Sequence, residues 1–586
     1  MLKVFFLSFI FFISQCKTEM NFFLDSTQSE KIKINFEQFA KTYKTNFYTD
    51  LFAKHNDIAL FVKEQFSSTV FRANEIFRQD EQLFFLKSFY KLEENFAFQT
   101  QLNSFVFSND RKFEIANAYS HNFLLGTSHK FNSLYFEPLV GYKFENQKTF
   151  HDKGVSIFVA SHIDTVKTDN TITFFNGNFQ KDFLTPRVLE NDNFNLHFIS
   201  DIESNTKNFT TFTFAKKRRE FYFSDTVVES RIDKNFSFTN TLDYEIDVDM
   251  RLKFFASLFN RTIEQKKNVE EKKLEIFSEM FWKISSFILT SKIDYFEQDE
   301  IHSEQNTISN LDNIAKKTSL YLNCNFPFLS NNTFTFNTFA SVLRYDTPSN
   351  FNYDDRDEIF YDIEAISTHK ILNNINLKIL FGGTSQHLSY ILKERSANNF
   401  RNFIIRFSPS IIFSNENFFS LNSAEVLSNY TVYDFETMSI LSPQSISFRQ
   451  YKIFDSTKIK LSTKVFLETT FNYKIFSRGE LNWNTFEESP ITFFEEIYCS
   501  LKPELLQQNK LLLNFGFVIL KQNRFNVKKN IKTLVQTLLN IGPTACFNWE
   551  GNKINLNIDV LNLFQFVNKK FQNTNTNFNI TLILKI

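Results

Sequence analysis

The clearest structural signal in this chain is Tyr244-Glu245-Ile246-Asp247-Val248-Asp249-Met250, in which apolar and charged side chains alternate. Successive side chains of a β-strand point to opposite faces, so strict alternation predicts a half-buried strand. The same period of two recurs upstream, in Ser156–Val159, Thr171–Phe174 and Phe209–Phe214. We therefore predict a β-rich domain over residues 101–255, with turns formed by Asn and Asp.

The apolar period lengthens to about 3.6 residues on both sides of this region, which indicates helices. Apolar side chains between Leu51 and Phe66 fall on one helical face, so residues 1–100 are predicted to be a helical N-terminal region. A second stripe between Val269 and Ile288 predicts a long connecting helix within residues 256–300. Residues 301–495 return to mixed signals and are predicted to form an α+β domain.

The last segment, residues 500–586, gives the most detailed prediction. An apolar strand over Leu511–Lys521 precedes a helix over Val527–Ile541, which Gly542-Pro543 would end. Two strands, a second helix and a final strand follow, and the order β-α-β-β-α-β is that of a ferredoxin-like unit. The predicted fold class is therefore α+β and multidomain, with a helical N-terminal part, a β-rich middle and a ferredoxin-like C-terminal domain.

Composition limits the possible functions. The chain has 586 residues, with 80 Phe but only 10 Gly, and 65 basic residues balance 65 acidic ones. A protein that mainly neutralises phosphate is usually strongly basic, and zero net charge favours association. We therefore expect a subunit of a large assembly, in which other protein subunits cover the surplus phenylalanines. No catalytic, cofactor or metal motif is present, so we predict a non-enzymatic protein without cofactor or metal.

Two kinds of candidate site follow from local sequence. Basic residues that would contact RNA backbone lie in two clusters: Lys216, Lys217, Arg218 and Arg219, and Lys521, Arg524, Lys528, Lys529 and Lys532. A solubilising hairpin tip for the first cluster and a solvated helix face for the second explain these residues equally well. A turn between a strand and a helix start would hold an anion at Gly382, Gly383, Thr384 and Ser385, although a tight turn without a ligand accounts for the same residues.

Residues 1–16 begin with one lysine before an apolar run, the outline of a secretory signal, but they suit a docking segment as well. The run is too short for a transmembrane helix, which needs about 20 apolar residues. Since no such run occurs elsewhere, we predict no independent membrane span.

The phenylalanine-rich, glycine-poor composition resembles that of divergent proteins encoded by ciliate mitochondrial genomes, because Phe, Asn, Lys and Ile have A/T-rich codons. The resemblance covers the whole chain and is compositional. It implies a mitochondrial location and a structural role in the mitochondrial ribosome, with rRNA as a partner. Two alternatives stay open: a soluble accessory subunit of a respiratory or ATP synthase complex, and a secreted or lipid-anchored protein of an AT-rich organism.

Overall fold

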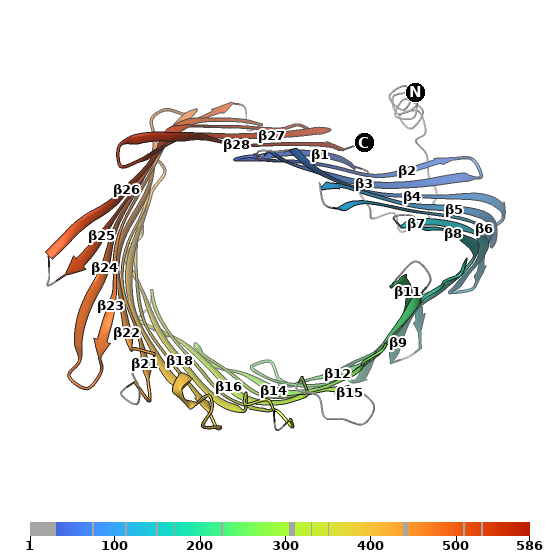
Figure 1. The fold of residues 1–586 in the computed structure, drawn as a ribbon, viewed down its shortest axis with the longest axis horizontal. Helices are drawn as coiled ribbons and strands as arrows, with labels where there is room; N and C mark the ends of the chain where they lie inside the picture. The colour runs from blue at the N-terminus through green and yellow to red at the C-terminus, as the bar shows by residue number, and fades with distance from the viewer. Residues whose placement is uncertain are drawn as a thin grey trace.

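A computed structural model shows one antiparallel β-sheet that closes on itself (Figure 1). The structure describes residues 31–72, 76–111, 114–147, 150–168, 170–223, 227–303, 311–329, 331–349, 351–436, 443–507, 510–528 and 531–585. Within them lie 28 strands and a single short 3-10 helix, η1 (Ser396–Asn398).

The first half of the sheet comprises β1 (Lys31–Phe39), β2 (Thr42–His55), β3 (Ile58–Arg72), β4 (Ile76–Glu93), β5 (Phe96–Arg111), β6 (Glu114–Phe131), β7 (Leu134–Gln147), β8 (Phe150–Lys167), β9 (Thr171–Thr185), β10 (Val188–Glu203), β11 (Thr206–Tyr222), β12 (Val228–Asp247), β13 (Met250–Glu264) and β14 (Asn268–Ile284). The second half comprises β15 (Phe287–Ser303), β16 (Asn313–Phe328), β17 (Asn332–Asp346), β18 (Arg356–Leu372), β19 (Ile375–Tyr390), β20 (Phe400–Ser414), β21 (Phe418–Tyr433), β22 (Ile446–Lys460), β23 (Val465–Asn482), β24 (Glu487–Gln507), β25 (Leu511–Lys528), β26 (Ile531–Glu550), β27 (Ile554–Val567) and β28 (Lys570–Lys585).

Each strand pairs with the strands before and after it, and β1 pairs antiparallel with β28, so the sheet is an up-and-down barrel without a free edge. A path that steps from each residue to its ladder partner on the next strand goes once round the barrel and returns to β1. It ends about 32 residues from the residue at which it began. With 28 strands, this shift corresponds to a strand tilt of about 38° and a mean diameter of about 55 Å.

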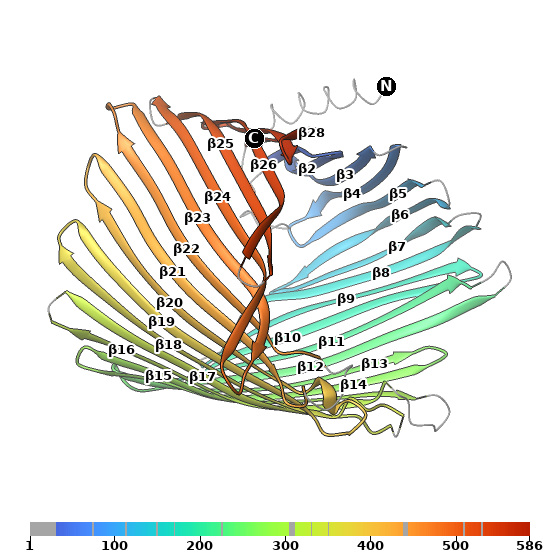
Figure 2. The same ribbon diagram turned by 60° about the vertical axis from the view of Figure 1, so that its left-hand side comes forward.

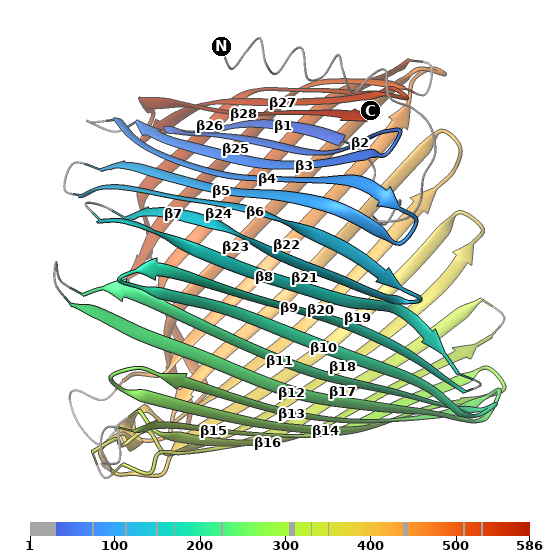
Figure 3. The ribbon, with the colours of Figure 1, turned by 90° about the vertical axis from the view of Figure 1, so that its right-hand side faces the viewer.

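The two ends of the barrel differ in their connections (Figures 2 and 3). At one end, which we call the short-turn end, every hairpin has two to four connecting residues. At the other, the long-loop end, the connections include the longer segments 304–312, 347–355, 391–399 and 434–445. Strand β1 begins and β28 ends at the short-turn end.

Turns in this chain do not depend on glycine. Hairpin residues with positive φ include Asn56 (51°), Asn132 (55°) and Asn568 (51°), and no described glycine has a positive φ. Asparagine tolerates the left-handed conformation because its short side chain forms local hydrogen bonds.

Several glycines lie instead where the sheet bends sharply. A Cβ on Gly141 of β7 would lie 1.8 Å from the carbonyl oxygen of Phe123, and one on Gly542 of β26 would lie 1.7 Å from that of Asn562. Only glycine lets neighbouring backbones approach so closely. In Figure 1 the wall turns near β6–β8 and again near β26–β27, where these glycines lie.

The predicted α+β fold class is wrong. The helical N-terminal region is β1–β5, the long connecting helix is the hairpin strands β13–β15, and the ferredoxin-like unit is β25–β28, with Gly542-Pro543 inside β26. The period-two segments lie in β8, β9, β11 and β12, and the motif at 244–250 contains the β12–β13 turn. The division into five domains stays a prediction, although one sheet runs through all the regions. The apolar segment 1–16 lies outside the described residues.

Candidate functional site

The outer face of the barrel carries a continuous apolar band. Ladder partners share a face of the sheet, which allows the inner and outer sides of every strand to be followed round the barrel. From β13 to β20 the outward positions next to the short-turn end are apolar and exposed, and we call them the outer band; they include Phe254, Leu258, Ile276, Ile293, Leu320, Val342, Ile363, Phe381 and Ile405. An exposed apolar surface of this extent marks contact with a membrane or another protein.

A ring of charged side chains ends the outer band on the side of the long-loop end. Neighbouring outward residues form ion pairs there, such as Lys272 with Glu270 (Nζ–Oε1 2.9 Å) and Lys316 with Glu297 (2.9 Å). Further members of this charge ring are Lys216, Lys234, Glu264, Asp299, Arg344, Asp357, His387 and Arg401. Within each ion pair the positive and negative charges balance, as the basic and acidic residues do over the whole chain.

The height of the outer band matches a lipid bilayer. On β14 the outward positions from Ile284 to Leu274 are apolar or small, and Lys272 follows. Each residue advances about 2.6 Å along the barrel axis at the tilt given above, so these positions span about 26 Å. Apolar bands of transmembrane β-barrels are about 25 Å tall.

Aromatic side chains gather on the outer face near the long-loop end. The ring of Trp483 stacks on Phe403 with centroids 5.4 Å apart and also contacts Tyr430 and Phe486. This cluster covers Tyr430, Val432 and Leu481, which are buried. Tryptophan and tyrosine at this level are typical of the aromatic girdles of membrane barrels.

The inner face is polar and charged, and several of its phenylalanines are covered by cations. Lys292 lies over the ring of Phe277 at 4.0 Å, Lys317 lies over Phe339, and Lys474 lies over Phe476. A cation above an aromatic face gains electrostatic attraction while its alkyl stem covers the ring. The inner wall therefore presents ammonium groups, amides and carboxylates to the lumen.

One part of the inner wall is densely packed. Where β4–β9 turn sharply, inward side chains of strands that are not neighbours meet, and Lys87 of β4 contacts Glu137 of β7 with Nζ–Oε2 at 2.8 Å. We call this region the packed corner. Its fully or nearly fully buried inward residues include Phe89, Ala97, Gln99, Leu124, Ser128, Leu139, Ser156, Asp182 and Leu184.

Arg187, in the β9–β10 turn, is the most buried cation of the packed corner, with 1% of its side chain exposed. Its guanidinium contacts Glu145 (2.9 Å) and Asp152 (2.5 Å) and donates to the backbone oxygen of Glu220 (2.8 Å). Burial opposes the charge, but the two carboxylates outweigh it and raise the pKa of Arg187. The hydroxyl of Tyr222 also donates to Asp152 (2.6 Å), so the carboxylate accepts bonds from two sides.

A second set of contacts continues the packed corner toward the short-turn end. Lys143 contacts Asp182 (2.8 Å) and Glu145 (3.4 Å), and Ser156 donates to Asp182 (2.6 Å). Asn122 in turn donates to Ser156 (3.1 Å). The buried charges are thus paired and hydrogen-bonded, which buried ions require.

The structure divides the first predicted RNA-binding cluster between two faces. Lys216 and Arg218 of β11 face outward, and Lys216 contacts Glu190 (2.6 Å) in the charge ring. Lys217 and Arg219 face the lumen. Strand alternation separates residues that a loop would have kept together.

The second basic cluster is also dispersed. Lys521 faces outward on β25, Arg524 faces inward over Phe494, and Lys532 of β26 lies 3.2 Å from the centroid of Phe493. Lys528 ends β25. Lys529 lies outside the described residues. The structure does not test RNA binding by either cluster, but it does not form one basic surface from them.

The predicted anion site does not adopt the expected backbone. Gly382, Gly383, Thr384 and Ser385 all lie within β19, and their residues pair with β18 and β20. The hydroxyl of Thr384 donates to Asp362 (2.8 Å). Because no turn or helix start is formed here, the amides that would hold an anion belong to the strand ladder; anion binding itself stays an untested prediction.

Neither a metal cluster nor a membrane-spanning helix is found in the part of the chain that the structure describes. No group of three or more His, Cys, Asp or Glu side chains there is placed to bind a metal ion. No helix among the same residues is long and apolar enough to cross a bilayer.

No protein-family model and no curated protein matches this sequence. Solved structures are similar in fold at low identity. The siderophore receptor PirA from Pseudomonas aeruginosa has 8% identity and a TM-score of 0.39, over 80% of this chain and 86% of that one. The copper transporter OprC has 7% identity and a TM-score of 0.43, over 97% and 82%. The FrpB iron transporter from Neisseria meningitidis has 8% identity and a TM-score of 0.38, over 96% and 81%.

The predicted functions and partners are wrong. A closed barrel with an outward apolar band is neither a ribosomal subunit with rRNA as its partner, nor a soluble accessory subunit, nor a secreted or lipid-anchored protein. The expectation of no independent membrane span is also overturned, since the outer band has bilayer height.

The mitochondrial location and the resemblance to ciliate mitochondrial proteins are overturned as well. An even number of strands, short turns at one end and longer loops at the other are typical of bacterial outer-membrane barrels.

Sequence reasoning missed the outer band, the charge ring and the packed corner. The signal that could have found the band is the recurrence of segments of about ten residues with alternating hydrophobicity, each ending in a turn. Ladder register places the members of the packed corner together, and no local motif marks them.

Proposed function

We propose that this chain is a membrane-spanning β-barrel that passes polar solutes through its lumen across an outer membrane of bacterial type. The observation that carries the proposal is the outer band of about 26 Å, which runs from the short-turn end to the charge ring. Lipid is the partner that such a band fits, because it runs across eight consecutive strands, β13 to β20, instead of forming one patch.

The inner wall supports the conducting role. Barrels of 16–18 strands already enclose a water-filled channel, and diameter grows with strand number. At about 55 Å mean diameter, the lumen of this barrel keeps room for water after inward side chains fill the packed corner. Ammonium groups, amides and carboxylates on the wall favour polar solutes over apolar ones.

Orientation follows from the connections. In outer-membrane barrels the short turns face the periplasm and the longer loops face outward. We therefore place the short-turn end toward the periplasm and loops 304–312, 347–355, 391–399 and 434–445 toward the exterior.

The test is reconstitution of the full chain in planar bilayers. We expect discrete conductance steps larger than those of 16-stranded porins under the same salt. Lys378→Glu, on the inner face of β19, should shift the reversal potential in a KCl gradient toward cation selectivity. The matched control Lys181→Glu, on the outer face of β9, should leave it unchanged.

Two results would contradict the proposal. A chain that inserts into bilayers but gives no conductance would exclude an open lumen. Equal shifts of the reversal potential from Lys378→Glu and Lys181→Glu would show that ions do not pass along the inner wall.

A further inference from the structure

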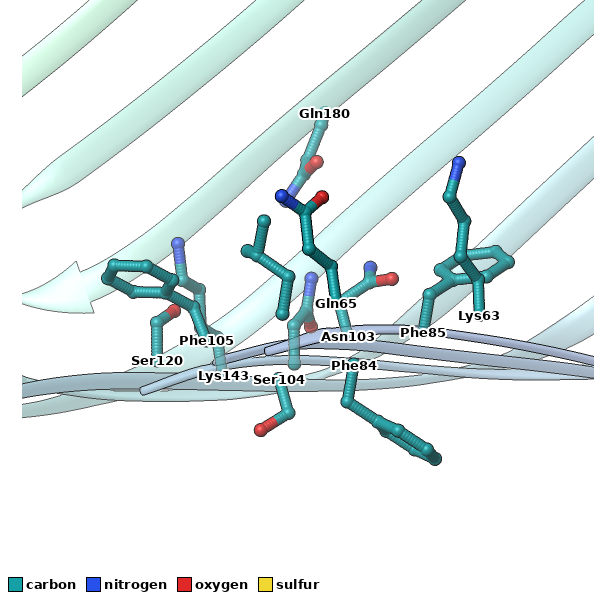
Figure 4. Close-up of a pocket in the computed structure, with 12 residues that line it drawn as sticks. Lys63, Gln65, Phe84, Phe85, Asn103, Ser104, Phe105, Ser120, Lys143 and Gln180 are labelled. Atoms are coloured by element: carbon teal, nitrogen blue, oxygen red, sulfur yellow. The ribbon is translucent and has the colours of Figure 1, made fainter. Parts of the chain in front are cut away.

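A cavity of about 460 Å³ opens on the inner wall beside the packed corner (Figure 4). Its lining comes from β3, β4, β5, β6, β7 and β9, and Figure 4 shows Lys63, Gln65 and Gln180 on the same side of the sheet. Phe84 and Ser104 point to the opposite side. We call this hollow the Gln65 cavity.

Ladder register builds the cavity from two adjacent rows of inward side chains. One row runs across four strands and contains Gln65, Leu83, Phe105 and Ser120. The next row runs across five strands and contains Lys63, Phe85, Asn103, Asn122 and Lys143. Since neighbouring strands are about 4.8 Å apart, each row is well over 10 Å long. The cavity is therefore an elongated groove with apolar members in the middle and polar members around them.

Three polar members of the cavity are free to bind a ligand, whereas Gln180 donates to Asp182 (3.1 Å). Among the described residues, the side chains of Gln65, Asn103 and Ser120 have no hydrogen-bond partner. Asn122 is 3% exposed, donates to Ser156 and leaves its own Oδ1 without a partner. A buried amide oxygen without a donor is costly unless a water or a ligand supplies one.

The charge of the cavity differs from that of the packed corner beside it. Lys143 is occupied by Asp182 and Glu145. Lys63 forms no ion pair among the residues described, and its ammonium group lies 5.9 Å from the centroid of the Tyr48 ring. The cavity thus offers one unpaired ammonium group at its rim and no unpaired carboxylate among its lining residues.

We propose that the Gln65 cavity is a binding subsite for oligosaccharides, with an added preference for sugars that carry a carboxylate, such as uronic acids. Side-chain amides donate and accept hydrogen bonds and so suit vicinal hydroxyls, while Phe85 and Phe105 supply flat apolar faces for the C–H side of a sugar ring. Lys63 would bind the carboxylate. The proposal names the solute class for the pore proposed above and in that sense rests on it.

Calorimetric titration of the full chain in detergent micelles tests binding without requiring conduction. The probes are a neutral glucan oligosaccharide and a galacturonate oligosaccharide of equal length. Loss of two amide partners in Gln65→Leu with Asn103→Leu should weaken binding of both probes about tenfold or more. The matched control Asn472→Leu removes an inward amide on β23, outside the cavity, and should leave binding unchanged.

Lys63→Met separates the two parts of the proposal. It should remove the advantage of the galacturonate probe and leave binding of the neutral probe unchanged. An absence of any galacturonate advantage in the unmodified chain would overturn the role of Lys63. Equal weakening by the double variant and by Asn472→Leu would overturn the cavity as the site.

The outcomes distinguish this inference from the pore. A chain that conducts ions in bilayers but binds neither probe would overturn the subsite and leave the pore standing. A chain that binds both probes through Gln65 and Asn103 but never conducts would overturn the pore and leave the subsite standing.

Discussion

A charge placed on the outer face should be costly only where the face lies in lipid. Ile293 of β15 faces outward and is 59% exposed, and Ile301 of the same strand faces outward and is 46% exposed. In water, replacing either exposed side chain by arginine would change stability by about 0.5 kcal/mol or less. In a membrane the cost of arginine depends on depth, and the two positions lie at different depths.

The depth of each position follows from the register of β15. The outer band on this strand begins near Phe287 and ends before Glu297. At about 2.6 Å of axial rise per residue, Ile293 lies within a few ångströms of the middle of a 25 Å band, whereas Ile301 lies about 10 Å beyond its edge. Arginine at the midplane of a barrel costs about 2–4 kcal/mol, and near the interface about 0–1 kcal/mol.

The assay is equilibrium unfolding in urea of the chain folded into lipid vesicles, followed by tryptophan fluorescence. We expect Ile293→Arg to lower the free energy of unfolding by about 2–4 kcal/mol and Ile301→Arg to lower it by less than about 1 kcal/mol. The two variants share the strand, the face and the substitution, and they differ in the depth of the arginine along the barrel axis. If the two variants lost equal stability, or if Ile293→Arg were neutral, the outer band would not be in contact with lipid.

Two further predictions concern the inside of the barrel. Arg187→Met should leave the buried Asp152 without its cation and Glu145 with Lys143 alone (3.4 Å), and lower the free energy of unfolding by about 3–5 kcal/mol. Arg251→Met, which removes a half-exposed ion pair, should cost less than about 1 kcal/mol in the same urea assay. Gly542→Ala would bring its Cβ to 1.7 Å from a carbonyl oxygen of the next strand. It should therefore prevent closure of the barrel, seen as loss of the heat-modifiable band in gel electrophoresis, whereas Gly383→Ala has its nearest neighbour at 3.9 Å and should fold normally.

Alternation in the sequence predicts a strand correctly where one face of the strand is charged. It does not reveal the strand where both faces carry phenylalanine. In the motif at Tyr244–Met250, Glu245 faces inward opposite Arg251, and the acidic residues that follow it end β12 and form the turn to β13. Elsewhere inward phenylalanines lie on the same strands as outward apolar residues, such as Phe277, which is covered by lysines, and Phe255, which stacks on Phe277. The contrast between the faces then disappears, and short apolar runs resemble a helical stripe.

The helix predicted near Leu51 shows how a hairpin imitates a period of 3.6. Leu51 of β2 and Val62 of β3 are ladder partners on the outer face, and the turn between them contains Asn56. Across this two-residue turn, ladder partners on the outer face are separated by 3, 7 and 11 positions, as in His55 with Ile58, Ala53 with Leu60 and Leu51 with Val62. In this segment those separations coincide with multiples of a helical turn, so periodicity alone cannot distinguish the two structures.

The site was less predictable than the fold, because its contacts join strands distant in sequence. Lys87 and Glu137 are separated by 50 residues, and the cavity draws on residues from Lys63 to Gln180. Such groups become neighbours only once the register of every intervening hairpin is fixed. The failure to predict a membrane span has a simpler cause: a search for about 20 apolar residues finds helices, whereas a β-strand crosses with about 9–11 residues, half of them polar.

The high phenylalanine content is explained by this architecture without partner subunits. In the membrane barrel proposed above, lipid would cover the outward rings and would require only that they be apolar, whereas a protein core also requires a shape that fits its neighbours. A codon bias toward phenylalanine is therefore tolerated more easily on a barrel exterior than in a globular core. Inward rings face water and need a cover, which lysine provides through its alkyl stem and its charge above the ring. The same bias enriches lysine, so the composition that loads the chain with aromatic rings also supplies the residue that makes them compatible with an aqueous lumen.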